Sequence, residues 1–355
     1  MDGADGTALM WQEILDQPGL VTAQLARLRE EARRTFDDGS TARGTVYLVG
    51  TGDSYIAARS SLYLWAHYTG RWPQAWPTRE FTSYCPVSRD DTAIIISTTG
   101  SAAATTAAAR AVEQGATMLA LTALPDGSLA RTCGRYLELP APWTRQTPHT
   151  RDYMATLLAL ACLVERYAGT ALIHLDEIGV VLNETIHMAR ATVKRLSAIG
   201  TGMTYFLGAG PLWPTAEYGA AKFWEAGGLP ALGLELEEAA HGLHLAVSTG
   251  DTVVIIANNG PHIDLARRLA EGFETLGATP VLVTDADTTL PDYPYILYPS
   301  VPDQWSHFVA SVPLQVLCHH VAVRQGFDVA RSRGGRDPDG LYETVRTAWL
   351  ASGTT

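Results

Sequence analysis

The sequence predicts an α/β fold built from two doubly wound, mostly parallel sheets that are flanked by helices. Short apolar runs alternate with alanine- or leucine-rich runs, and glycine turns separate them. This pattern favours a parallel sheet that is covered on both faces. The whole pattern then repeats at an offset of about 160 residues, which indicates duplication of a domain rather than a solenoid. A chain of 355 residues with 46% hydrophobic residues is long enough to form two such cores.

Each copy contains three strand-like runs in the same order. They lie at 45–49, 93–96 and 118–121 in the first copy and at 203–207, 253–256 and 280–283 in the second. We expect a helical lead-in over 1–30, a first domain over 31–170, a connecting helix over 171–200, a second domain over 201–330 and a tail over 331–355. In this architecture ligands bind at the carboxyl ends of strands, above helix N-termini.

Composition excludes several classes of partner. The formal net charge is −11 and no run is rich in lysine or arginine, so we expect neither nucleic acid nor a membrane as partner. The start of the chain lacks a signal-peptide pattern, and the most apolar stretch, 154–164, is too short to span a bilayer. A cytoplasmic protein is therefore expected.

The cysteines and histidines do not indicate a metal site. Cys85, Cys133, Cys162 and Cys318 are scattered, and we expect all four to be buried and unpaired. The pairs His241/His244 and His319/His320 lack further ligands at suitable spacing. No metal and no cofactor are predicted.

The stretch from Lys222 to His241 is the candidate for chemistry. Helical spacing of i,i+3 places Lys222 and Glu225 on one face. A carboxylate beside a lysine, with a histidine available, suits proton transfer next to a sugar carbonyl. On spacing alone, an ordinary solvated salt bridge is the alternative.

Six short segments follow one another along the chain: Met10–Pro18, Gly52–Tyr55, Ser97–Ser101, Gly219–Glu225, Glu238–Gly242 and Gln315–Gly326. In this order they resemble the motifs of the SIS (sugar isomerase) superfamily, and within it those of the isomerase half of glucosamine-6-phosphate synthase and of the fructosamine-phosphate deglycases. In that family the corresponding motifs are a lead-in, two sugar-phosphate loops, a catalytic helix, a Glu-x-x-His-Gly segment and a last helix.

The resemblance implies a mechanism and a subunit arrangement. Glu225 would move a proton between C1 and C2 of an open-chain sugar, through an enediol or enolamine. His241, supplied by the neighbouring subunit of a homodimer, would assist ring opening, and Lys222 would hold the charge that develops on the reacting oxygens. The residues implied in substrate binding are Gly52, Asp53, Ser54, Ser97, Thr98, Thr99, Gly100 and Thr150.

The chain also departs from the family pattern. Asp53 and Ala102 stand where the synthase has threonines that contact phosphate, and Thr144 replaces a glutamate. No lysine follows Asp337, and no glutaminase domain precedes Met10. We therefore expect an isomerase or isomerising deaminase that acts on an amino-sugar or ketose phosphate. A non-phosphorylated sugar, a ketosamine deglycase and a non-catalytic sugar-phosphate sensor stay open as alternatives.

Overall fold

The computed structural model describes residues 6–35, 44–140, 148–196, 199, 202–288 and 293–351. Thr144 lies outside these residues. The chain divides into two compact units that interleave along the sequence. The β1–β5 unit comprises Gln17–Thr144 and Arg151–Gly179, and the β6–β10 unit comprises Met1–Asp16, Arg145–Thr150 and Val180–Thr355. Two helices, α1 (Gly6–Thr35) and α7 (Ile173–Val193), contribute residues to both. The sequence-based domain boundaries stay predictions.

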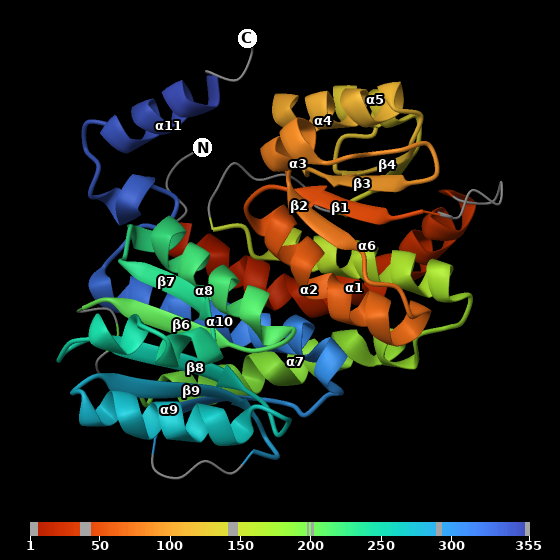
Figure 1. The fold of residues 1–355 in the computed structure, drawn as a ribbon. Coiled ribbons are helices and arrows are strands. Elements are labelled where there is room, and N and C mark those ends of the chain that lie inside the picture. Colours follow the sequence, from red (N-terminus) through yellow and green to blue (C-terminus); the bar gives the residue numbers. More distant parts are fainter. Residues whose placement is uncertain are drawn as a thin grey trace. The chain divides into compact units, whose positions relative to one another are not determined.

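The β1–β5 unit is a parallel five-stranded sheet in the order β2-β1-β3-β4-β5. Figure 1 shows α3, α4 and α5 on one side of it and α2 and α6 on the other. The strands are β1 (Val46–Gly50), β2 (Gln74–Pro77), β3 (Thr92–Ile96), β4 (Thr117–Thr122) and β5 (Tyr136–Glu138). The helices are α2 (Asp53–Thr69), α3 (Thr78–Tyr84), α4 (Ala102–Glu113), α5 (Ser128–Cys133) and α6 (Arg151–Ala168).

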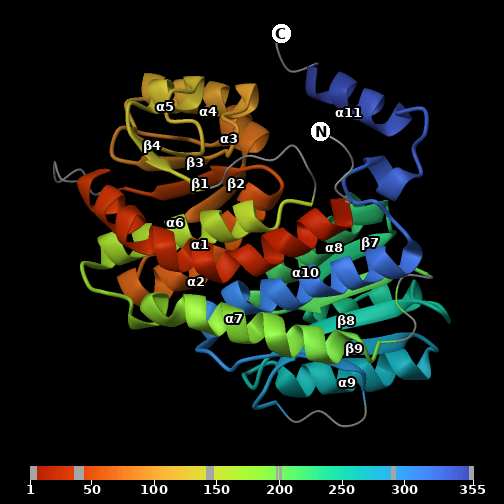
Figure 2. The same ribbon diagram turned by 180° about the vertical axis from the view of Figure 1, so that it is seen from behind.

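The β6–β10 unit has a second parallel five-stranded sheet, in the order β10-β9-β8-β6-β7. Helix α9 covers one face, while α8 and α10 cover the other (Figures 1 and 2). The strands are β6 (Thr204–Gly208), β7 (Ala231–Glu235), β8 (Thr252–Ala257), β9 (Thr279–Asp285) and β10 (Tyr295–Tyr298). The helices are α8 (Leu212–Gly227), α9 (Ile263–Thr275), α10 (Ser306–Gln325) and α11 (Leu341–Ala351), with short 3-10 turns η1 (Glu237–Ala240), η2 (Leu243–Leu245), η3 (Asp303–Trp305) and η4 (Ser332–Gly335).

Read from β7, the second sheet has the order β7-β6-β8-β9-β10, which matches β2-β1-β3-β4-β5 in the first. Single residues also correspond between the two sheets. Asp91 accepts hydrogen bonds from the backbone N–H groups of Thr45 and Ser88, both at 2.8 Å. Asp251 accepts the equivalent bonds from Met203 at 3.0 Å and Ser248 at 2.8 Å. In each unit one buried aspartate therefore ties together the amino ends of the two central strands.

The α/β prediction with parallel sheets flanked by helices is confirmed, but the sequence revealed only the inner strands. The predicted runs coincide with β1, β3, β4, β6, β8 and β9, which are buried almost throughout. The outer strands β2, β5, β7 and β10 were not predicted. They are short and only partly buried, and β2 contains no fully buried residue, so they lack the continuous apolar run of a central parallel strand. Pro77, inside β2, weakens the strand signal further.

The four cysteines are buried and free, as predicted. Burial raises the pKa of both Cys133 and Cys162 to about 12, so these thiols stay protonated and unreactive. Within the described residues, no helix is long and apolar enough to cross a membrane. The same residues contain no cluster of three or more His, Cys, Asp or Glu side chains that could hold a metal ion.

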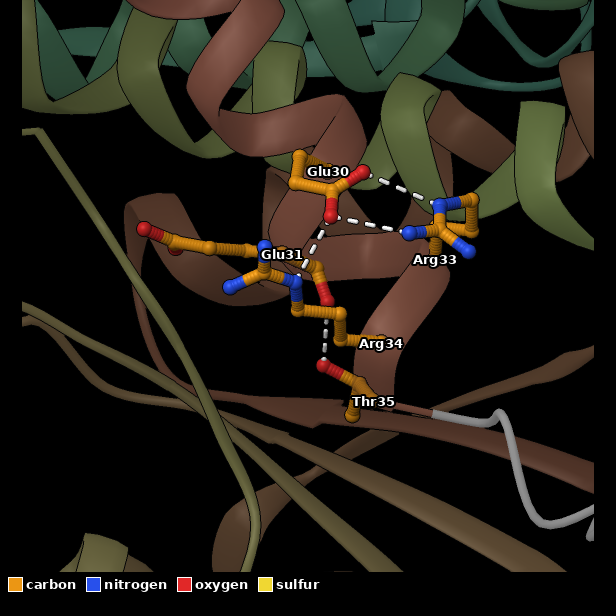
Figure 3. Close-up of polar contacts among 5 residues, drawn as sticks. All are labelled: Glu30, Glu31, Arg33, Arg34 and Thr35. Carbon is orange, nitrogen blue, oxygen red and sulfur yellow. Dashed lines mark hydrogen bonds and ion pairs between the residues drawn. The ribbon is translucent and has the colours of Figure 1, made fainter.

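Ion pairs and hydrogen bonds link side chains at the carboxyl end of α1 (Figure 3). Glu30 accepts hydrogen bonds from Arg33 at 2.8 and 2.9 Å and from Arg34 at 2.6 Å. These guanidinium groups lower the pKa of the Glu30 carboxyl to about 2. The Thr35 hydroxyl donates to the Glu31 carbonyl at 2.7 Å. Basic side chains in the last turn complement the negative end of the helix dipole, but such exposed pairs add little stability.

A buried histidine in α10 predicts a specific pH dependence of stability. His307 is fully buried, and neither ring nitrogen makes a hydrogen bond of good geometry within the described residues. Burial lowers the pKa of His307 to about 3 from 6.5, while the backbone of Gln304 acts weakly in the opposite direction. Because the folded pKa is depressed, the unfolded chain gains a proton first as the pH falls. We expect His307 alone to remove about 2 kcal/mol of unfolding free energy between pH 7 and pH 5.

The measurement is urea unfolding at pH 7 and pH 5 for wild type and His307→Leu. The leucine variant should be more stable at pH 7, by about 1 kcal/mol, because it removes unpaired polar atoms from the core. It should also lose less stability than wild type on acidification. His187→Gln, at an exposed position on α7, serves as the control and should keep the wild-type pH dependence. Equal pH dependence in His307→Leu and wild type would show that His307 does not carry the effect.

Candidate functional site

The first predicted loop lies where the topology of the β1–β5 sheet favours a ligand. Strands β1 and β3 are neighbours, but their connections leave in opposite directions, because α2 leads to β2 on the far side of β1. Crevices at the carboxyl ends of such strands are the usual ligand positions in open α/β sheets. The loops after β1 and β3 carry Gly52–Ser54 and Ser97–Gly100. The structure therefore places both predicted loops at one edge of the sheet.

A glycine at the end of β1 allows the helix to start so close to the strand. A Cβ on Gly50 would lie 2.8 Å from the backbone of Ser54. A Cβ on Gly208, at the end of β6, would lie 2.2 Å from the Leu212 carbonyl oxygen. Gly52 has a φ of +58°, a conformation that favours glycine. These contacts explain the Gly-x-Gly pattern in both copies.

The loop after β3 is built from hydroxyls and turns. The backbone N–H of Gly100, with φ +59°, donates to the Ser97 carbonyl at 3.1 Å. The Ser97 hydroxyl accepts from the backbone N–H of Ser101 at 3.1 Å, and the Ser101 hydroxyl accepts from that of Ala104 at 3.3 Å. Ser101, the last residue of the predicted loop motif, is thus the N-cap of α4. Thr99 is exposed, while Ser97 and Thr98 are half-buried.

The two helix N-termini at this edge differ in charge. Asp53 lies in the first turn of α2, where its carboxylate already complements the positive end of the helix dipole. The first turn of α4 contains no acidic residue. An anion at this edge would therefore find its better electrostatic site at α4, beside the hydroxyls of Ser97, Thr98 and Thr99.

The β6–β10 unit holds the predicted catalytic pair. Lys222 is fully buried, and its Nζ lies 2.5 Å from Oε2 of Glu225. The ammonium also lies 4.9 Å from the centre of the Tyr218 ring. The Glu225 side chain is 30% exposed, so a ligand can still reach its carboxylate. A solvated salt bridge, the simpler interpretation of this spacing, does not describe a lysine with no exposed surface.

Residues of helix α10 contact Tyr218 and Lys222, and the sequence did not predict these contacts. Gln315 donates through Nε2 to the Tyr218 hydroxyl at 3.0 Å, and the Cys318 thiol donates to the Lys222 carbonyl at 3.2 Å. The chain has only two lysines, Lys194 and Lys222. Burying one of them is unfavourable unless a carboxylate and a polarisable ring compensate the charge. Tyr218, four residues before Lys222, could have been found from helical spacing.

The chain connects Glu225 and His241 to opposite ends of β7. Glu225 is near the end of α8, and the indole N–H of its neighbour Trp224 donates to the carbonyl of Ala231, the first residue of β7, at 2.9 Å. His241 is exposed and follows η1, beyond the other end of β7. The first and last residues of this five-residue strand, Ala231 and Glu235, lie about 13 Å apart.

Thr150 makes its contacts within the β6–β10 unit. It is buried, and Oε2 of Glu13 accepts hydrogen bonds from its hydroxyl at 3.2 Å and from its backbone N–H at 3.4 Å. Glu13 belongs to the lead-in motif, but sequence reasoning gave it no role. The predicted site residues are thus divided: Gly52–Ser54 and Ser97–Gly100 lie in one unit, and Lys222, Glu225, His241 and Thr150 in the other.

The burial of Lys222 predicts strong coupling with Glu225. We expect a double-mutant cycle with Lys222→Met and Glu225→Gln to give a coupling free energy of about 1–3 kcal/mol in unfolding experiments. Arg346 and Glu343 on α11 form a control pair with the same i,i+3 spacing, and their side chains are 64% and 60% exposed. That pair should give less than about 0.5 kcal/mol. Similar values for both cycles would contradict a buried, partly desolvated ion pair.

The sequence of this chain is similar to those of known proteins. The SIS domain model matches residues 40–166. The chain is 27% identical over 346 residues to the glutamine–fructose-6-phosphate aminotransferase (isomerizing) of Pyrobaculum aerophilum, covering 91% of this chain and 56% of that protein. The corresponding enzyme of Methanothermobacter thermautotrophicus is 28% identical over 332 residues, covering 90% and 55%. The chain therefore spans about half the length of these curated relatives.

Solved structures share the fold. The C-terminal domain of glucosamine-fructose-6-phosphate aminotransferase from Francisella tularensis superposes with a TM-score of 0.81 at 20% identity, covering 91% of this chain and 97% of that one. Tagatose-6-phosphate ketose/aldose isomerase from Escherichia coli gives a TM-score of 0.76 at 17% identity, covering 93% and 96%. The predicted resemblance is confirmed: residues 40–166 match the SIS domain, in a chain similar over about nine-tenths of its length to part of the isomerizing aminotransferases.

Proposed function

We propose that the protein is an isomerase-type enzyme that moves a proton between C1 and C2 of an amino-sugar or ketose phosphate. The observation that carries the proposal is the buried Lys222 held 2.5 Å from a partly exposed Glu225. The carboxylate takes the proton from one carbon and returns it to the neighbouring carbon, so the intermediate is an enediol or enolamine. The Lys222 ammonium stabilises the negative charge that develops on the reacting oxygen.

We propose further that the β6–β10 unit is a second SIS domain, so that the chain carries two in tandem. Three features support this: the shared strand order, the equivalent strand-end glycines Gly50 and Gly208, and the equivalent aspartates Asp91 and Asp251. Within the first domain, the loops after β1 and β3 would bind a sugar phosphate.

The position of His241 supports a homodimer with a shared active site. Within one chain, Trp224, next to Glu225, contacts the first residue of β7, whereas His241 follows the turn after the last residue of that strand. Glu225 and His241 are both at least partly exposed, so a second copy can bring its His241 to the Glu225 of the first. In this arrangement His241 assists ring opening by moving the proton at O5.

Deuterium exchange tests the reaction class. The protein is incubated in deuterated water with fructose 6-phosphate, glucosamine 6-phosphate or a fructosamine phosphate, and the products are followed by NMR. Deuterium entering C1 or C2 is expected, and Glu225→Gln should abolish it while binding persists. Release of ammonia identifies a deaminase, and release of a larger amine identifies a deglycase. Binding without exchange for every sugar would leave a non-catalytic sensor as the function.

Mixing two inactive variants tests the shared site. Glu225→Gln and His241→Asn should each be inactive alone. After unfolding and refolding together, they should recover about a quarter of wild-type activity, because half of the dimers are mixed and each mixed dimer holds one intact site. Size-exclusion chromatography with light scattering confirms that dimers have formed. Dimers without recovered activity would show that both residues act within one chain.

Asp53 provides a test of the phosphate. Replacing the carboxylate in Asp53→Thr removes a like charge next to a bound dianion, so sugar-phosphate affinity should rise about fivefold. Asp90→Asn, an exposed change at the amino end of β3, is the matched control for net charge and should have little effect. Weaker binding in Asp53→Thr would instead indicate that the carboxylate accepts hydrogen bonds from a sugar that carries no phosphate there.

A further inference from the structure

The last turn of α8, which carries Glu225, has low intrinsic helical stability. The sequence from this residue onward is Glu225-Ala226-Gly227-Gly228, and α8 ends at Gly227. Glycine allows the chain more conformations than any other residue, and the last turn of a helix lacks part of its hydrogen bonds. A catalytic base in this turn requires a tertiary contact that holds the helix end in place.

Part of the helix end is closed locally. The backbone N–H of Gly228 donates to the Trp224 carbonyl at 2.7 Å, and that of Leu229 donates to the Phe223 carbonyl at 3.2 Å. Gly228 has a φ of +58°, so this closure is the glycine-dependent type. The Gly227 carbonyl, at the end of the helix, takes no part in these bonds and can accept a hydrogen bond from another donor.

The C-terminal turn Phe327–Arg336 supplies that donor. Arg336 donates from Nη2 to the Gly227 carbonyl, and its guanidinium stacks 4.4 Å from the centre of the Phe327 ring. A Cβ on Gly227 would lie 2.4 Å from the same ring, so the helix end and Phe327 are in close contact. A cation here also complements the negative end of the α8 dipole.

The turn itself is held under strain. Arg333 is the non-glycine residue with positive φ, at +52°, in the described part of the chain. Its guanidinium donates to the Tyr342 hydroxyl at 2.8 Å and stacks 4.5 Å from that ring. Its Nε would lie 3.0 Å from a Cβ on Gly228. An unfavourable backbone conformation persists only where surrounding contacts impose it.

The other end of the turn is fixed to the start of α1. The Thr7 hydroxyl donates to the Phe327 carbonyl at 2.8 Å, and the backbone N–H of Gly6 donates to the Asp328 carboxylate at 3.2 Å. The turn therefore has anchors on α1, α8 and α11, all within the β6–β10 unit.

We propose that the turn Phe327–Arg336 is a clamp on the last turn of α8 and that Arg336 is a positioning residue for the Glu225 carboxylate. The inference rests on the proposed role of Glu225 as the base. Arg336 is exposed and lies outside the hydrophobic core, so its contribution to global stability is small. Its effect is local, because Gly227 is only two residues from Glu225.

The test compares full-length Arg336→Gln and Arg336→Lys with wild type. In the exchange assay, Arg336→Gln should lower kcat about tenfold, because a small displacement of a base reduces catalysis strongly. KM and the melting temperature should stay close to wild type. Arg336→Lys, which can still donate to the Gly227 carbonyl, should recover part of the loss. Arg346→Gln on α11 removes an exposed arginine that pairs with Glu343 and should leave kcat unchanged.

Amide hydrogen exchange of the same proteins gives a readout that does not depend on activity. Arg336→Gln should speed exchange at the amides of Gly228 and Leu229 about tenfold, while those of β6 stay unchanged. If wild type turns over no sugar, the proposed function fails, and amide exchange alone still tests the clamp. Unchanged protection of Gly228 and Leu229 in Arg336→Gln would overturn it. Equal loss of kcat in Arg336→Gln and Arg346→Gln would overturn the positioning role.

Discussion

Both sheets depend on one steric constraint: no side chain fits where the first central strand meets the helix that follows it. Gly50 and Gly208 occupy these positions, and a Cβ on either would overlap backbone atoms of the next helical turn. The close approach brings a helix N-terminus to the carboxyl edge of the sheet, where backbone N–H groups and hydroxyls can meet an anion. The same constraint thus shapes the core and the predicted binding loops.

The second feature of consequence is the buried charge. A lysine without exposed surface is unfavourable in a protein core, and here one carboxylate and one aromatic ring compensate it. One member of the ion pair, Lys222, therefore lies in the apolar packing of α8 and α10. The other member, Glu225, is only partly buried, so a ligand can reach its carboxylate. The chain connects Glu225 and His241 to opposite ends of β7, and this placement supports the proposed mechanism, in which a second copy supplies the histidine.

The structural features that could be predicted are those that a local sequence pattern encodes. The inner strands are apolar throughout because both faces are covered, so β3 and β8 could be recognised as continuous runs. The outer strands could not, because only part of each is buried. The proximity of Lys222 and Glu225 followed from helical spacing. Their environment did not, because Gln315 and Cys318 contact α8 across sequence separations of 97 and 96 residues.

Neighbours within a few residues were enough to predict the fold class, the repeated pattern, the hydroxyl loops and the helix that carries Lys222 and Glu225. The burial of Lys222, the contact of Glu13 with Thr150 and the capping of Gly227 by Arg336 could be seen only in the folded chain. These last two contacts join residues 137 and 109 positions apart. No local pattern encodes such contacts, since they form only when packing brings distant segments together.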